Sequence, residues 1–518
     1  MPAFPRFLTV SAASAQTCGA DTFKHTLEFV VIKGVEVYTE GKEALWIRTC
    51  CESWTVKGSE AMGENNMIHM GRLTEEELDR EAWELTRKLV MTESTDPGVY
   101  EGKIGEFICR WFAERGIETV REEVLPGRFN VMARVGKPEG KALVYICHMD
   151  TVILGEGWTE GRGPLDGVVE IAEESLQDDR EEKEGLPNGG TAPLTGGSKR
   201  KTERLYGRGA CDMKSGLACA MVSFAWAADR FFREDDRAQE SEGWKADGRT
   251  PGRRVPEHQE LPDSLVFIGT VDEEDFMRGA EAAIRSGWVK QEDWVVDMEP
   301  TDGQIQASHK GRVWFELNIK GEAAHASMPW KGADAIAGMA EAVCRIRKEI
   351  AACPAHPELG ISTVTFGQIT GGVRPYVVPE SCTVWIDMRL VPPMDQEGAE
   401  RVVRAGIQAA KENVPGTDGS YLITGSRPYV ERDENSGLLA ALLISCERIT
   451  GRPAEIGPFP GYTDTAVIAG ILKNHNCMSY GPGSLSMAHK PDEYVDREDV
   501  VRCRRVFCDL AGWIGREN

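Results

Sequence analysis

Continuously apolar runs alternate with amphipathic segments over most of this chain of 518 residues. Apolar runs are typical of strands that are buried on both faces of a sheet. They read ALVYIC (142–147), LVFIGT (265–270), WVVDM (294–298) and CMSYG (477–481). Helical patterns separate these runs, and one of them, 75–90, follows Thr74, a residue type that caps helices. The pattern predicts an α/β domain with a mostly parallel central sheet.

The pattern changes between about 308 and 425. The segments 313–321 and 381–391 alternate apolar with polar residues, as strands with one exposed face do. The residues after Asp334 and Glu397 have a helical period. We therefore predict an α+β unit, inserted into the α/β domain. The expected boundaries are 73–306 and 427–518 for the α/β domain and 307–426 for the inserted unit.

Three segments fit neither unit. Residues 1–72 contain two strand-like stretches, which favours either a small hairpin extension or an artefact of an upstream reading frame, since Met67 and Met70 precede the first clear helix. Segments 160–204 and 233–263 are rich in glycine, proline and charge. They have little capacity to bury a core, so both are predicted to be solvated loop insertions.

Composition narrows the function classes. A net charge of −23 argues against a nucleic-acid partner and an anionic membrane surface. The longest apolar run is shorter than the roughly 18 residues of a membrane span. The 14 scattered cysteines favour a reducing compartment. The opening residues 1–16 end like a signal peptide, but their apolar stretch is short and broken by Ser and Thr. We therefore predict a cytoplasmic protein.

Residue types that bind metals follow the predicted core strands. Any one of them alone has an ordinary interpretation, such as a structural histidine, a turn aspartate or a solvated acidic patch. The carboxyl ends of parallel strands share one edge of a sheet, so these side chains should meet there. Crowded carboxylates repel unless cations neutralise them, and the nitrogen and oxygen donors suit zinc or a similar ion. The residues are His148, Asp150, Asp212, Glu273, Glu274, Glu299 and His489.

Seven stretches, in this order, resemble motifs of the dinuclear zinc hydrolases that include acetylornithine deacetylase, succinyl-diaminopimelate desuccinylase, the aminoacylases and glutamate carboxypeptidase. They are CHMDTV, YGRGACDMKSG, DEED, MEPT, GEAAHASMP, GPGSLSMAH and PDEYV, and they span roughly residues 70–518. The resemblance implies a zinc-exopeptidase-like catalytic domain. It also implies that the inserted unit is a ferredoxin-like lid, through which two chains form a homodimer.

The resemblance also assigns metal ligands. Asp212 would bridge two divalent metal ions, zinc in the first instance with Co²⁺ or Mn²⁺ as alternatives. His148 and Glu299 would complete one site, and Glu274 and His489 the other.

Catalytic roles follow in the same way. Asp150 would orient His148, and Glu273, which is not a ligand, would be the general base. His325 matches a histidine that stabilises the oxyanion and often comes from the partner subunit. Without the resemblance, His325 would be an ordinary turn histidine.

Substrate-binding residues are implied on the lid and on a loop near the C-terminus. Arg389 matches an arginine that binds the substrate carboxylate. Tyr376 stands at or near a position where many relatives have asparagine, and it cannot reproduce the donor–acceptor pair of an amide. Thr463, in GYTD, resembles part of a substrate loop.

Together these observations predict hydrolysis of the amide bond of a small, carboxylate-bearing substrate, with an N-acyl amino acid first and deacetylase or desuccinylase activity. A carboxypeptidase or dipeptidase acting on short peptides with the same metals is the alternative. Because Tyr376 stands where many relatives have asparagine, a modified or xenobiotic amide is a further candidate substrate. A binding homologue without catalysis is the alternative from another class, and it would be expected to have lost a ligand or the base.

Overall fold

The computed structural model describes residues 30–32, 35–39, 45–49, 54–56, 68–175, 199–232 and 260–514. The chain divides into two compact units, Met1–Ser53 and Trp54–Asn518. In the described part of the first unit, β1 (Val30–Ile32), β2 (Val35–Thr39) and β3 (Leu45–Thr49) form an antiparallel sheet. The strand-like stretches noted in the sequence therefore form strands.

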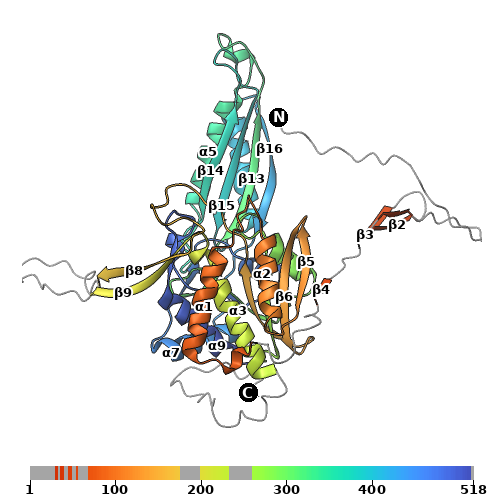
Figure 1. Ribbon diagram of the computed structural model, residues 1–518. Coiled ribbons are helices and arrows are strands. Elements are labelled where there is room, and N and C mark those ends of the chain that lie inside the picture. The colour runs from red at the N-terminus through yellow and green to blue at the C-terminus, as the bar shows by residue number, and fades with distance from the viewer. Residues whose placement is uncertain are drawn as a thin grey trace, which may run out of the picture. The chain divides into compact units, whose positions relative to one another are not determined.

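A mixed sheet is the centre of the second unit (Figure 1). Among the described residues its order is β17 (Ile456–Phe459), β12 (Ile305–His309), β18 (Cys477–Ser479), β11 (Trp294–Asp297), β7 (Ala142–His148), β10 (Ser264–Thr270), β6 (Arg128–Gly136), β5 (Thr119–Leu125) and β4 (Trp54–Val56). Strands β18, β11, β7 and β10 run parallel, and antiparallel strands flank them. The predicted α/β class with a mostly parallel centre is confirmed.

Helices cover both faces of this sheet, which explains why its central strands β7, β10 and β11 are buried along their whole length. In β7, Leu143, Tyr145 and Cys147 belong to one buried cluster and Val144 and Ile146 to another. The first cluster includes α1 (Glu75–Val90), α2 (Gly102–Ala113), α3 (Ser215–Ala227), α7 (Gly437–Thr450) and α9 (Arg497–Ala511). The second includes α4 (Arg278–Arg285) and α8 (Asp464–Leu472). This three-layer packing fixes the strand ends rigidly.

The predicted start of the first helix is confirmed. Thr74 accepts a hydrogen bond from the backbone N–H of Glu77, and the Glu77 carboxylate accepts one from the backbone of Thr74. This reciprocal arrangement satisfies two N–H groups that the first turn of a helix leaves free.

The inserted unit is a four-stranded antiparallel sheet with two helices. In chain order it comprises β13 (Gly311–Lys320), α5 (Ala335–Ala351), β14 (Thr363–Gly371), β15 (Ser381–Leu390), α6 (Gln396–Asn413) and β16 (Asp418–Arg427). The spatial order is β14-β15-β13-β16, and the helices share one buried cluster with the sheet. This βαββαβ order is the ferredoxin-like arrangement, so the predicted lid architecture is confirmed.

Two expectations need correction. Segment 160–204 is not all loop, because β8 (Val168–Ser175) and β9 (Lys199–Tyr206) pair in an antiparallel ladder that β19 (Tyr494–Asp496) extends. Backbone pairing can hold such charged strands without a core. Segment 1–72 is not wholly an extension, since β4 pairs with β5. Residues 1–16 and 233–259 lie outside the described residues.

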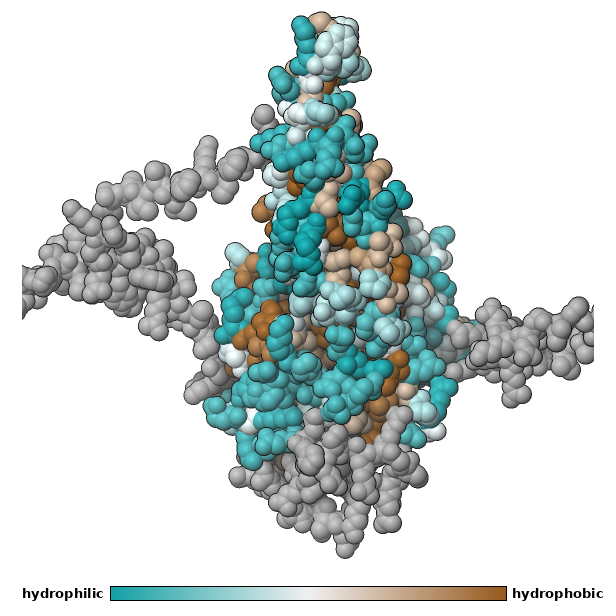
Figure 2. All heavy atoms as spheres, turned by 180° about the vertical axis from the view of Figure 1, so that it is seen from behind, coloured by the Kyte–Doolittle hydropathy of each residue, from teal (hydrophilic) through white to brown (hydrophobic). Residues whose placement is uncertain are grey.

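The surface of the described part is largely hydrophilic on the face in Figure 2, with hydrophobic side chains in small patches. No helix among the described residues has the length and apolar character needed to cross a membrane.

Candidate metal centre

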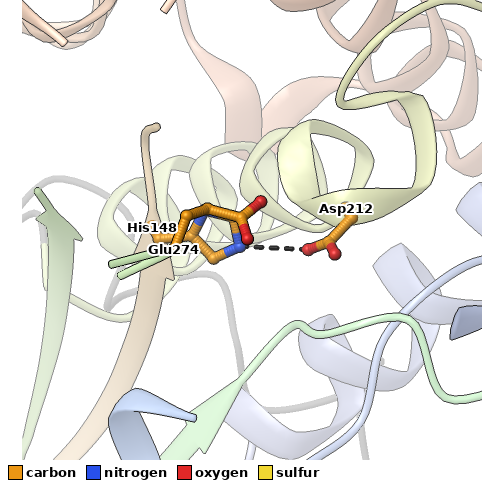
Figure 3. Close-up of side chains that lie close together, drawn as sticks. All are labelled: His148, Asp212 and Glu274. Atoms are coloured by element: carbon orange, nitrogen blue, oxygen red, sulfur yellow. Dashed lines mark hydrogen bonds and ion pairs between the residues drawn. The ribbon is translucent and has the colours of Figure 1, made fainter. Parts of the chain in front are cut away.

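The five proposed ligands come together at the carboxyl end of the central strands. Asp212 lies at their centre, and its two carboxylate oxygens face different histidines. His148 Nε2 is 3.1 Å from Oδ1 of Asp212, and His489 Nε2 is 3.3 Å from Oδ2 (Figure 3 shows the first of these contacts). A carboxylate that bridges two metal ions has this disposition.

The remaining two carboxylates lie one beside each histidine. Oε1 of Glu299 is 3.7 Å from Nε2 of His148, and Oε2 of Glu274 is 3.0 Å from Nε2 of His489. Two half-sites result, each with one imidazole, one glutamate and one oxygen of Asp212. Glu273 also lies here, since its ligand atom is within 4.8 Å of those of His148 and Glu299.

The hydrogen bond of Nδ1 of His148 fixes the orientation of the imidazole ring, so that Nε2 faces the half-site. Nδ1 lies 2.9 Å from the backbone oxygen of Asp150, so Nδ1–H donates to that carbonyl. Nε2 is therefore the nitrogen that faces Asp212 and Glu299, and it is the one that would bind a metal ion. Metal-bound histidines usually have their second nitrogen held in this manner.

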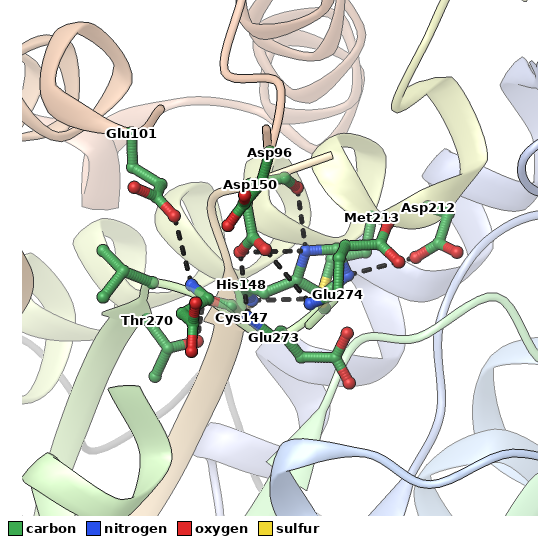
Figure 4. Close-up of polar contacts among 12 residues, drawn as sticks. Asp96, Glu101, Cys147, His148, Asp150, Asp212, Met213, Thr270, Glu273 and Glu274 are labelled. Atoms are coloured by element: carbon green, nitrogen blue, oxygen red, sulfur yellow. Dashed lines mark hydrogen bonds and ion pairs between the residues drawn. The ribbon is translucent and has the colours of Figure 1, made fainter. Parts of the chain in front are cut away.

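The carboxylate of Asp150 contacts other groups than the sequence suggested. Its Oδ1 is 3.9 Å from Nδ1 of His148, whereas its two oxygens accept hydrogen bonds from the backbone N–H groups of Glu273 (3.2 Å) and Glu274 (3.1 Å) (Figure 4). Asp150 thus orients His148 through its main chain and fixes the DEED loop through its side chain.

Electrostatics show that the centre is short of positive charge. Burial, together with the nearby Asp212, raises the pKa of Glu299 well above its ordinary value. Burial and the nearby Asp464 and Glu274 raise the pKa of Glu273. Hydrogen bonds to Asp212 and Glu274 raise the pKa of His489 to about 10. The buried carboxylates thus compete for the available protons, as expected where cations belong.

The side chains present fit a pair of divalent ions. Oε1 of Glu274 is buried and has no hydrogen-bond partner among the described residues, which leaves it available as a ligand atom. The donors are imidazole nitrogens and carboxylate oxygens, a set that zinc, cobalt and manganese accept.

Two glycines hold the strand end that carries Glu299. A Cβ atom on Gly216, in α3, or on Gly481, after β18, would collide with the carbonyl oxygen of Met298. These close approaches explain why the KSG and YGPG stretches contain glycine at these positions.

A buried ion pair behind the centre was missed in the sequence. Glu493 is fully buried, and its Oε1 accepts hydrogen bonds from the backbone N–H groups of Cys211 (3.0 Å) and Asp212 (3.2 Å). Its Oε2 accepts one from Arg208 (2.6 Å), which also donates to the backbone oxygen of Lys490. The pair therefore connects the Asp212 turn to the His489 loop. The PDEYV stretch contained a signal for this ion pair, because in it the acidic Glu493 lies between a turn and the start of the strand β19.

We expect Glu493→Gln to weaken metal binding by roughly 10- to 100-fold, because it removes the charge that holds the Asp212 backbone in place. Competition with a chelator measures this affinity. Asp492→Asn is the matched control, since Asp492 is the adjacent acid and bonds to Thr159 instead. Unchanged affinity in Glu493→Gln would contradict this role.

The lid residues lie apart from the five ligands. His325 is exposed and pairs with Val377 through an isolated bridge, and its Nδ1 lies 2.8 Å from Oγ of Ser327. Tyr376 is 60% exposed, and its carbonyl accepts a hydrogen bond from Ala326. In the described residues of one chain, no hydrogen bond or ion pair joins His325 or Tyr376 to the metal centre.

The other two proposed substrate residues already have partners. Arg389 donates from Nε (2.8 Å) and Nη2 (3.1 Å) to Asp387. Thr463 is buried and caps α8, where its side chain accepts a hydrogen bond from Ala466.

Comparisons with known proteins identify similar enzymes. Residues 307–415 match the peptidase dimerisation domain of the M20 family. The chain is 25% identical over 441 residues to acetylornithine deacetylase of Proteus mirabilis, covering 82% of this chain and 95% of the relative. The corresponding enzyme of Vibrio campbellii is 26% identical over 409 residues, with 78% and 89% covered.

Solved structures share the fold at low sequence identity. Aminopeptidase PepT from Bacillus cereus superposes with a TM-score of 0.58 at 17% identity, covering 86% of this chain and all of that one. A dinuclear metal-binding peptidase of the M20 family from Bacillus subtilis gives 0.54 at 15% identity, with 84% and 98% covered.

Fold, centre and relatives together define a metal-dependent hydrolase that acts on amide bonds. Its inserted unit matches the M20 peptidase dimerisation domain, and over most of its length the chain is similar to acetylornithine deacetylases and shares the fold of M20 metallopeptidases.

Proposed function

We propose that the protein hydrolyses an N-acyl amino acid, releasing a carboxylic acid and an amine, with His148, Asp212, Glu274, Glu299 and His489 as ligands of two metal ions. The observation that carries the proposal is the position of Asp212, which offers one oxygen to each of two histidine–glutamate pairs. The similarity to acetylornithine deacetylases at about a quarter identity supports the deacylase reading.

Two divalent ions in such a centre supply Lewis acidity and make a water nucleophilic near neutral pH. Glu273 accepts the proton of the attacking water and delivers it to the leaving nitrogen. Asp150 keeps Glu273 and Glu274 in fixed relation through their backbone N–H groups.

The lid completes the site in this proposal. His325 donates a hydrogen bond to the oxyanion that forms on the attacked carbonyl. No hydrogen bond or ion pair joins His325 to the metal centre of its own chain within the described residues, and we assign it to the site of the partner subunit, in a homodimer formed through the lid. Arg389 contributes positive charge that attracts the substrate carboxylate. Tyr376, which lies beside His325, contacts the acyl group of the substrate. Thr463 acts indirectly, by holding the start of α8.

A cytoplasmic location is also part of the proposal. All cysteines in the described part of the chain are free thiols, as expected in a reducing compartment.

A substrate panel tests the reaction. Purified protein loaded with zinc or cobalt should release free amine from N-acetyl- or N-succinyl-amino acids faster than from dipeptides. Faster cleavage of dipeptides would favour the peptidase alternative. Binding of two metal ions per chain without cleavage of any amide would favour the binding homologue.

A further inference from the structure

Three arginines stand in one row across the sheet of the lid. Arg312, on β13, is directly opposite Arg389 on β15 and Arg427 on β16. Directly opposite residues of antiparallel strands point to the same face. The next residue, Val313, belongs to the core cluster under the lid helices, so the three guanidinium groups project from the other face. Like charges placed directly opposite each other are destabilising, so the row requires negative charge.

The two outer arginines already have their counter-charge. Arg389 is bound by Asp387, as described above. Arg427 lies 2.7 Å from Oε1 of Glu281 and donates to the backbone oxygen of Phe276. The charges of the outer positions are therefore compensated within the chain.

The central arginine has no such partner. Arg312 is only 8% exposed, its Nε is buried without a hydrogen bond, and no carboxylate of the described residues forms an ion pair with it. The ring of Trp314 lies 4.0 Å from Cζ of Arg312, and the indole N–H of Trp314 donates to Asp387. Burial, and then Arg389 and Arg427, lower the pKa of the Arg312 guanidinium. A buried, unpaired charge is costly to keep unless something neutralises it.

The row lies beside the loop that carries the proposed base. Phe276, three residues after Glu273, stacks edge-on against Trp314 and accepts the hydrogen bond from Arg427. An anion bound at Arg312 would thus belong to a small molecule that also reaches the catalytic centre. The ring of Tyr462 lies 6.0 Å from Arg312, and its hydroxyl lies within hydrogen-bond distance of the backbone oxygens of Pro428 and Ala466, so it offers Arg312 no negative charge.

The geometry points to Arg312 as the principal anchor for a carboxylate of the substrate, in the same chain whose Glu273 acts on that substrate. The inference rests on the proposed function and makes it more specific. An anchor at Arg312 favours substrates that have a free carboxylate. Arg389, already neutralised by Asp387, contributes less to binding that carboxylate. A guanidinium fork binds a carboxylate through two parallel hydrogen bonds, which neither a lysine nor a glutamine can reproduce.

Calorimetric titration tests this with N-acetyl-L-alanine and its carboxamide, N-acetyl-L-alaninamide. The zinc-loaded Glu273→Gln chain is used so that the probe is not consumed. We expect the carboxylate to bind at least about tenfold more tightly than the carboxamide. Adding Arg312→Gln should abolish this preference and Arg312→Lys should reduce it. Adding Arg389→Gln should have a smaller effect, and Arg345→Gln, on the exposed side of α5, should have none.

The outcomes separate this inference from the proposed function. If the Glu273→Gln chain with Arg312 in place prefers the carboxylate, and adding Arg312→Gln removes the preference, the inference stands. It stands even if no amide in the substrate panel is hydrolysed. If amides are hydrolysed but Arg312→Gln weakens carboxylate and carboxamide equally, only the inference fails. The inference is also overturned if the Glu273→Gln chain with Arg312 in place shows no preference for the carboxylate. Circular dichroism spectra of each variant distinguish lost binding from lost folding.

Discussion

Replacing Glu273 with glutamine is expected to lower kcat by roughly 10²–10⁴-fold while both metal ions remain bound. Glutamine has nearly the same shape and can stay in place beside His148 and Glu299. It has no carboxylate to accept the proton of water, and no acid to return that proton to the leaving nitrogen. The defect should therefore appear in kcat and kcat/KM together, as for an interaction made only in the transition state.

Metal analysis and steady-state kinetics on the same preparation measure this effect. Asp275→Asn is the matched control, because Asp275 belongs to the same DEED run but is exposed. It should retain near-normal activity. Substantial turnover by Glu273→Gln would remove Glu273 from the role of base, and loss of metal would mean that Glu273 is a ligand.

The same variant tests the lid histidine. If His325 acts in the partner subunit, Glu273→Gln and His325→Ala impair different parts of each composite site. A mixed dimer of the two variants then has one site with both defects and one site with neither. Coexpression should restore activity that neither variant has alone. Mixed dimers that remain inactive would show that His325 does not act across the interface.

Replacing Asp212 with asparagine is expected to have the second largest effect, a fall from two bound metal ions per chain to one or none, with activity reduced to the detection limit. Both half-sites use an oxygen of Asp212, whereas the other four ligands each serve one. An amide offers one oxygen and no negative charge, so it cannot bridge two cations.

Metal content measured by atomic emission, with His489→Ala alongside, checks this prediction. His489→Ala removes a ligand from one half-site only and should keep the ion of the other. If Asp212→Asn keeps two ions, Asp212 does not bridge them, and the division into two half-sites is incorrect.

The sequence predicted the sheet and the meeting of its strand ends because both depend on local patterns. Continuous apolar runs marked the buried strands, and His148, Glu273, Glu274 and Glu299 follow those runs directly. A parallel sheet brings such ends together whatever their separation along the chain. His489 and Asp212 were also candidates, although neither follows the end of an apolar run directly, and only the family resemblance assigned their roles as ligands.

Other features depend on contacts that no local pattern encodes. The ion pair of Arg208 and Glu493 joins residues 285 positions apart. The strands β8 and β9 were hidden by their charge. Arg312 attracted no attention because a strand arginine is usually solvated, and only the register of three strands places it between two others.

The two histidines of the centre differ greatly in their access to water. The side chain of His148 is 1% exposed and that of His489 is 51% exposed. An ion held by His148 would be enclosed by protein, whereas one held by His489 would lie close to solvent. Loading and loss should thus be sequential, with the interior position filled first and emptied last. During slow dialysis against a chelator, a singly occupied form should accumulate, and a different metal offered to it should enter only the outer place.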